Sequence, residues 1–158
     1  MFLWRVMKNA LQTGVDLKKR GIVIPNCNFR CSFCGQEEET KDHIFFSCIA
    51  VYDVWMRCYS WFGIVSVWLE STQQIFCQRV MVSGSALANR IWRILWCSIT
   101  WVIWNWRNNA VFRGTALNFH KLWHDALFHY WSWLKSYEPN FNYSYVQWET
   151  NPGPCIDQ

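Results

Sequence analysis

Short stretches of helical periodicity occupy the first part of the chain. Residues 2–12 carry apolar side chains close to the 3.6-residue period and stop before Gly14, which predicts a first short helix. A second helix is predicted over residues 15–20, because Thr13 lies three residues ahead of Asp16 in the spacing of a capping box and a glycine follows the segment. Both helices are too short to be stable without tertiary contacts.

Three longer helical patterns follow. Residues 49–62 present one apolar face, made of Val51, Val54, Trp55, Cys58 and Phe62. Residues 86–112 form the longest pattern, which Ser85 can cap and Gly114 ends. The last pattern covers residues 118–137 and repeats apolar side chains at Leu122, Ala126, Leu127, Tyr130 and Trp133 or Leu134.

These patterns predict a mainly α fold, in which a small zinc-stapled helical domain is followed by Trp-rich helices. The predicted divisions are a domain over residues 1–62, a linker over 63–85, a Trp-rich helical segment over 86–137 and an irregular tail over 138–158. The chain of 158 residues can bury a core, and 52% of its residues are apolar, which argues against disorder. With thirteen Trp, large side chains must pack on one another or on a partner.

The apolar run over residues 91–106 raises the question of a membrane span. It is shorter than the roughly twenty residues that a span needs, Arg93 interrupts it, and Trp is scattered along it. We therefore predict a buried helix and no membrane contact, with a membrane span and a partner-binding helix as the alternatives. The opening residues lack the pattern of a secretory leader, so we expect an intracellular protein, with the nucleus as a candidate compartment and reduced thiols.

The clearest chemical signal is a set of three cysteines and one histidine. Cys31 and Cys34 are two residues apart, Gly35 lets the backbone fold back, and His43 and Cys48 return after short intervals. Zn²⁺ prefers four tetrahedral thiolate and imidazole ligands. Since four protein ligands leave no open coordination position, we predict structural and not catalytic Zn²⁺.

Two alternatives to this ligand set stay open. The cysteines can be ordinary buried thiols, which is how we interpret Cys58, Cys77, Cys97 and Cys155. Cys27 lies four residues before Cys31 and can replace one of the four ligands.

The order of these motifs resembles the zinc-binding domain of the reverse transcriptases of plant LINE-type, non-LTR retrotransposons. The residues that carry the resemblance are Phe2 or Leu3 with Trp4, Leu11-Gln12-Thr13, Leu17 with Arg20, Cys31 with Cys34, Glu39-Thr40, His43, Cys48 and Trp55. The long helix is similar to the Trp-rich helix that follows this domain in such proteins, through Trp104, Arg107, Asn108 and Phe112. The resemblance implies an origin in a retrotransposon reading frame.

Three departures from the family pattern shape the interpretation. Gln12 replaces the usual proline, the family domain normally begins a few dozen residues earlier, and the tail resembles a linker before a ribonuclease H-like domain that does not follow. We therefore expect an N-terminally truncated domain without polymerase or nuclease. Glu37, Glu38 and Glu39 form one local acidic run, whereas a two-metal nuclease needs dispersed carboxylates.

The leading functional hypothesis is a non-catalytic zinc module that binds RNA or target DNA. Small zinc modules contact phosphates through cations and stack aromatic rings on bases. The candidate contacts are Lys18, Lys19, Arg20, Arg30, Phe29 and Phe33. The alternative for these residues is that the cations are only solvated and the two Phe pack beneath the metal. The net charge of +4 is mild and favours a polyanionic partner only weakly.

Two further hypotheses belong to other classes of function. In the first, the chain is a structural or protein-interaction remnant whose Trp-rich helices bind a partner or self-associate. In the second, His120 and His124, four residues apart with Asp125 beside them, bind a metal or move protons in an enzyme. Histidine pairs on a helix without a third ligand are more often simple surface residues, so we predict no enzyme.

Overall fold

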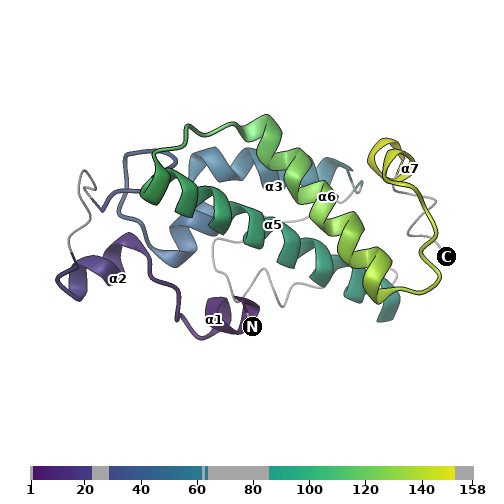
Figure 1. Ribbon diagram of the computed structural model, residues 1–158, viewed down its shortest axis with the longest axis horizontal. Coiled ribbons are helices and arrows are strands. Elements are labelled where there is room, and N and C mark those ends of the chain that lie inside the picture. The colour runs from purple at the N-terminus through teal and green to yellow at the C-terminus, as the bar shows by residue number, and fades with distance from the viewer. Residues whose placement is uncertain (1, 23–28, 62, 64–85, 152–158) are drawn as a thin grey trace.

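The computed structural model describes residues 2–22, 29–61, 63 and 86–151. The elements within these residues are α1 (Phe2–Met7), α2 (Gly14–Lys19), the π-helix η1 (His43–Ser47), α3 (Ile49–Trp61), α5 (Ala86–Arg113), α6 (Phe119–Tyr137) and α7 (Tyr145–Thr150) (Figure 1). No strand occurs in the described part of the chain, where β-pairing is limited to one bridge between Arg30 and Glu38. The predicted mainly α class is therefore confirmed.

Helices α5 and α6 form a long antiparallel pair on which α1, η1, α3 and α7 pack (Figure 1). The chain reverses between them because Gly114 adopts a left-handed conformation with φ of 62° and ends α5, while Asn118 caps α6 by accepting a hydrogen bond from the Lys121 N–H. A hydrogen bond also joins α6 to α5 away from this turn: the buried Tyr130 hydroxyl donates to the Ile91 carbonyl at 3.1 Å. Short capped connections of this kind favour antiparallel neighbours.

A single core of aromatic and aliphatic side chains runs from α1 to α7. Helix α3 contributes Val51, Val54, Trp55 and Cys58, the predicted face of this segment, all of them buried; Phe62 lies outside the described residues. In the same core, Phe46 of η1 stacks on Trp96 of α5 with ring centroids 6.1 Å apart. Tryptophans from several elements thus pack on one another inside the molecule.

The first helix is shorter than predicted. It ends at Met7, because Asn9 adopts a left-handed conformation with φ of 53° and the Ala10 N–H donates to the Arg5 carbonyl in a Schellman-type turn. The turn sends Leu11 into the core, where it is 4% exposed. Asparagine tolerates this conformation better than most residues, so the ending has a local cause.

The tail also differs from the expectation of irregular structure. Residues 145–150 form α7, which Ser144 and Gln147 cap reciprocally. Trp148 is fully buried, with ring centroids 4.8 Å from Trp61 and 5.0 Å from Tyr130. A helix of six residues is too short to show a hydrophobic period, so its docking on other helices decides its structure. The predicted linker lies almost entirely outside the described residues.

A buried ion pair joins the N-terminal segment to α5. Glu39 is 1% exposed and Arg107 is 2% exposed. The Arg107 Nε and Nη2 groups donate to Glu39 Oε1 at 2.9 and 2.5 Å, and the Gly14 N–H donates to the same oxygen at 2.8 Å. The guanidinium also lies over the Trp104 ring, 4.9 Å from its centroid. Glu39 therefore holds α2 and α5 through one carboxylate.

Gly14 is required where α2 approaches the cysteine loop. A Cβ at this position would lie 2.8 Å from the Phe29 carbonyl oxygen, so a larger residue would push the two segments apart. The predicted cap of α2 also forms, because the Asp16 carboxylate accepts hydrogen bonds from the Thr13 N–H and hydroxyl.

Helix α5 packs as a buried element of the core. Its polar side chains Ser98 and Thr100 are fully buried and donate to carbonyl groups of the same helix. None of the described helices combines the length and the apolar character that crossing a bilayer requires.

Substituting either partner of the Glu39–Arg107 pair should destabilise the protein strongly, and the effects of the two substitutions should not add. Arg107→Met should lower the free energy of unfolding by about 3–5 kcal/mol, because it leaves a buried carboxylate without its cation. Glu39→Gln should act similarly, and the double variant should cost less than the sum of the two. Urea unfolding of the zinc-loaded protein, followed by Trp fluorescence, measures the free energy of unfolding of all three variants.

Lys121→Met, in the exposed pair with Asp125, is the control and should lower the free energy of unfolding by under about 1 kcal/mol. Strict additivity in the double variant would contradict a coupled pair.

Candidate metal centre

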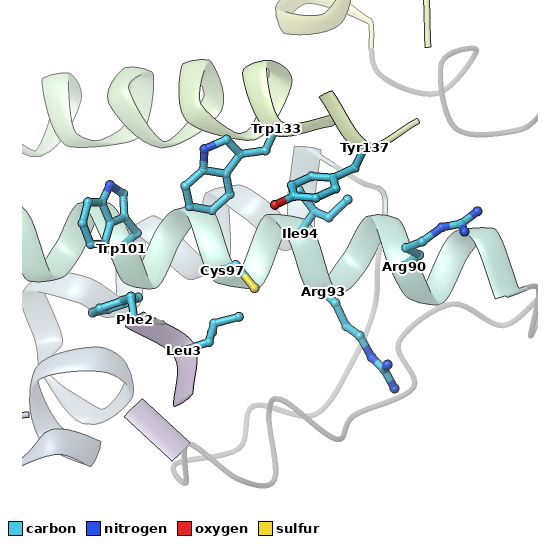
Figure 2. A pocket seen from close by; sticks show the side chains of 9 residues that line it. All are labelled: Phe2, Leu3, Arg90, Arg93, Ile94, Cys97, Trp101, Trp133 and Tyr137. Carbon is cyan, nitrogen blue, oxygen red and sulfur yellow. The ribbon is translucent and has the colours of Figure 1, made fainter. Parts of the chain in front are cut away.

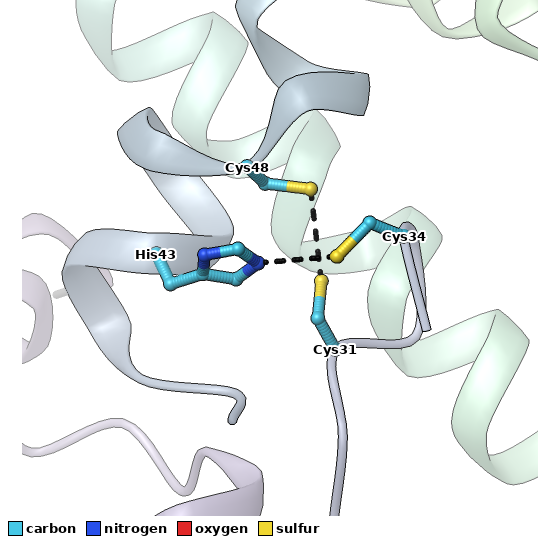
Figure 3. A group of neighbouring side chains, drawn as sticks. All are labelled: Cys31, Cys34, His43 and Cys48. Atoms are coloured by element: carbon cyan, nitrogen blue, oxygen red, sulfur yellow. Dashed lines mark hydrogen bonds between the residues drawn. The ribbon is translucent and has the colours of Figure 1, made fainter. Parts of the chain in front are cut away.

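The four metal-ligand candidates come from three consecutive structural units (Figure 3). Cys31 and Cys34 lie in one tight turn, closed by a hydrogen bond from the Gly35 N–H to the Cys31 carbonyl at 2.8 Å. Gly35 has φ of 68°, so the predicted need for a glycine at this turn is met. His43 begins η1, and Cys48 follows η1 directly before α3.

The side chains of these residues converge on one point. All four donor atoms lie within 4.8 Å of one another, with Cys31 Sγ 3.7 Å from Cys48 Sγ and Cys34 Sγ 3.4 Å from His43 Nε2. Tetrahedral zinc with ordinary bond lengths places two sulfurs about 3.8 Å apart and a sulfur about 3.6 Å from a nitrogen. The separations and the donor set therefore fit structural Zn²⁺, as predicted.

The π-helical turn explains how His43 and Cys48 meet. In an α-helix, five residues turn the chain by about 500°, which would leave the two side chains about 140° apart. Here the Cys48 N–H donates to the His43 carbonyl at 2.9 Å, across five residues, and the wider turn brings Cys48 back toward His43. Ile44, Phe45 and Phe46 between them are fully buried, so the turn is held by the core.

Contacts at Nδ1 fix the orientation of the His43 imidazole. His43 Nδ1 lies 3.1 Å from Glu37 Oε2 and 3.3 Å from Ser47 Oγ, so its Nε2 faces the cluster. Glu37, Glu38 and Glu39 are consecutive in the sequence, a pattern that is usually a solvated loop. In the structure the three diverge: Glu37 contacts His43, Glu38 pairs with Lys18 at 3.4 Å, and Glu39 holds Arg107.

A hydrogen bond between the buried thiols of Cys31 and Cys48 shifts their pKa values in opposite directions. The hydrogen bond from Cys31 lowers the pKa of Cys48 to about 5, helped by backbone N–H groups at the start of α3 and by His43, and opposed by burial. The same hydrogen bond and burial raise the pKa of Cys31 well above its ordinary value. Deprotonation of Cys48 is thus favoured over that of Cys31, and a cation at the cluster would stabilise both thiolates.

The remaining described cysteines lie apart from the cluster. Burial raises the pKa of Cys58 far above its ordinary value, and burial raises the pKa of Cys97 to about 12. Both therefore stay protonated at neutral pH and behave as small apolar side chains, as predicted. Cys27, the alternative ligand, lies outside the described residues, as do Cys77 and Cys155.

The predicted nucleic-acid contacts are only partly brought together. Lys18, Phe29 and Arg30 line one surface hollow of about 320 Å³, together with Gln36 and Glu38. The Phe29 backbone has φ of 59° and its ring is half-buried.

The other three candidates lie outside the set that lines this hollow. Lys19 and Arg20 are exposed at the end of α2, whereas Phe33 is half-buried and packs against the core. Of the two predicted stacking rings, Phe29 thus belongs to the hollow and Phe33 to the core.

A larger groove lies between α1, α5 and α6 (Figure 2). It has a volume of about 690 Å³ and aromatic walls that include Phe2, Trp101, Trp133 and Tyr137. Among the described residues that line it there is no carboxylate and no histidine, and its one thiol is the protonated Cys97.

Comparison with known proteins identifies the N-terminal region. The family model described as zinc-binding in reverse transcriptase matches residues 1–55. The match contains all four converging residues and ends within α3, so α5, α6 and α7 lie beyond it. No curated protein and no solved structure matches the chain.

The cluster predicts one tightly held zinc ion per chain. Cys34→Ser should abolish stoichiometric zinc and unfold η1, because three remaining ligands cannot complete the tetrahedron. Glu37→Gln should weaken zinc binding about 10–100-fold through the loss of the His43 contact. Elemental analysis gives the stoichiometry, and competition with a chromogenic chelator gives the affinity. Cys97→Ser, which alters a thiol outside the cluster, should keep one zinc. Full zinc in Cys34→Ser would show that the predicted ligand set is wrong.

Proposed function

Residues 1–55 carry the zinc-binding domain of reverse transcriptases, and from this premise we propose that the chain is a non-catalytic zinc module that binds nucleic acid. We propose in addition that it comes from a retrotransposon reading frame and acts in the nucleus. The family match concerns a zinc-binding domain and not a polymerase domain. The observation that carries the proposal is the hollow formed by Lys18, Phe29 and Arg30 beside the cysteine turn.

The coordination geometry supports a structural role for the metal. Cys31, Cys34, His43 and Cys48 would supply all four ligands, and three of them are nearly inaccessible, with 1%, 4% and 0% exposure for Cys31, His43 and Cys48. A closed tetrahedron offers no position for a substrate or an activated water. The ion would instead order the loop that bears Phe29 and Arg30.

The surface next to the metal has the two elements that single-stranded nucleic acid requires. Lys18, Lys19, Arg20 and Arg30 are exposed cations that can contact phosphates. The Phe29 ring, beside Arg30 in the hollow, offers a face on which one base can stack. Both RNA and a melted DNA target have this chemistry, and the Lys18–Glu38 pair is exposed enough for a phosphate to replace Glu38.

The second candidate is a structural or protein-interaction role without nucleic-acid binding. Its specific support is the apolar outer face of α3, where Ile49 is 68% exposed and Met56 is 41% exposed, together with Trp4 at 62%. The Trp-rich helices offer less support, because Trp92, Trp96 and Trp148 are buried within the molecule. Light scattering at increasing protein concentration separates the two functions, since self-association through α3 would raise the average mass.

Nucleic-acid binding should depend on salt and on the cations beside the metal. Binding of fluorescent single-stranded RNA, and of duplex DNA, is measured by anisotropy at several salt concentrations. The Lys19→Gln, Arg20→Gln double variant should lower the slope of log affinity against log salt by about one to two. Phe29→Leu should weaken binding of single strands by roughly 1 kcal/mol or more and leave the slope unchanged.

The matched control removes two exposed cations elsewhere, Arg57→Gln with Lys135→Gln, on α3 and α6. It should leave binding close to that of the unaltered protein. Affinity that ignores salt, or equal losses in both double variants, would favour the structural role over the nucleic-acid role.

A further inference from the structure

Two imidazole side chains lie side by side on α6. His120 and His124 are one helical turn apart, and their Nε2 atoms face each other at 3.4 Å. The ring centroids are 4.5 Å apart. Both side chains are accessible, since His120 is exposed and the His124 side chain is 42% exposed. Neither residue belongs to the zinc cluster.

A carboxylate faces the second ring nitrogen of His124. Its Nδ1 lies 2.8 Å from Glu149 Oε1 on α7, so a neutral His124 donates its Nδ1–H to that oxygen. The Nε2 atom then carries a lone pair directed toward His120. The Tyr145 hydroxyl donates to the same Glu149 oxygen at 3.3 Å, which holds the carboxylate in place. Carboxylate, imidazole and free lone pair are arranged as in protein sites for transition metals.

The separation of the two nitrogens suits one metal ion. With metal–nitrogen bonds of about 2.0–2.1 Å, two nitrogens 3.4 Å apart subtend about 110° at the metal, close to the tetrahedral angle. We propose that His120 and His124 chelate a divalent late first-row transition metal, with Glu149 as the positioning carboxylate behind His124. For imidazole ligands the general order of affinity places Cu²⁺ above Ni²⁺ and Zn²⁺, whereas the near-tetrahedral angle is the one that Zn²⁺ prefers.

The carboxylate that completes this arrangement is not the neighbour in sequence. Asp125 is engaged by Lys121 Nζ, 3.3 Å from Oδ2, and by the Trp106 indole N–H, 3.1 Å from the same atom. Asp125 is therefore already paired with Lys121 and Trp106. The tertiary fold instead supplies Glu149, 25 residues from His124.

The site would also tie α7 to α6. A metal on His124 Nε2 makes the Nδ1–H a stronger donor, so the bond to Glu149 should tighten. Since Glu149 lies in α7, binding at the histidines should slow amide exchange in Tyr145–Thr150. This readout is independent of the first zinc ion, whose ligands lie on other elements.

The test uses the full chain with its zinc centre loaded. Isothermal titration with NiCl₂, and separately with CuCl₂ in a weakly coordinating buffer, should detect one further ion per chain. His120→Asn and His124→Asn should each weaken Ni²⁺ binding at least tenfold, and Glu149→Gln should weaken it about 10–100-fold. His129→Asn, on the same helix, is the matched control and should bind Ni²⁺ like the unaltered protein.

Two further measurements keep the outcome unambiguous. Circular dichroism confirms that each variant is folded, and paramagnetic Ni²⁺ should broaden the imidazole signals of His120 and His124 before that of His129. Ni²⁺ binding that survives both histidine substitutions would place the ion elsewhere and overturn the proposal. Absence of binding below millimolar Ni²⁺ would also overturn it, and would leave the histidine pair as a simple hydrogen bond.

Discussion

The buried Glu39 carboxylate is the interaction on which the arrangement of the molecule depends. One of its oxygens receives the N–H at the start of α2 and two N–H groups of Arg107 from α5, and the other receives the Ser32 hydroxyl from the cysteine turn at 3.4 Å. Two charges at 1% and 2% exposure are tolerable because they are paired and hydrogen-bonded. Glu39 therefore joins the loop of Cys31 and Cys34 to α5, although the family match ends before α5.

The metal cluster and the ion pair divide the work of ordering the N-terminal region. The cluster joins the turn of Cys31 and Cys34 to η1, and η1 is in turn packed against α3 and α5. The ion pair joins α2 and the loop to Arg107, in the C-terminal part of α5. Segments too short to be stable alone are thus held by a few strong polar contacts over an aromatic core.

Neighbouring charged residues have separate roles in this structure. Glu37, Glu38 and Glu39 contact a histidine of the cluster, a surface lysine and a buried arginine respectively. On α6, Asp125 pairs within its own helix and with Trp106, whereas His124 takes its carboxylate from α7. Direction of the side chain decides these partners, because adjacent residues on a turn or helix point to different sides.

Much of this protein follows from the sequence alone. Helical periodicity determined the three long helices and the buried face of α3, and ligand spacing determined the group of Cys31, Cys34, His43 and Cys48, because local spacing limits which side chains can reach one ion. Only the tertiary structure decided the π-turn at His43, the docking of α7 and the partners of Glu39 and His124. These features depend on contacts between residues far apart in the chain, and sequence periodicity does not predict which of those side chains come into contact.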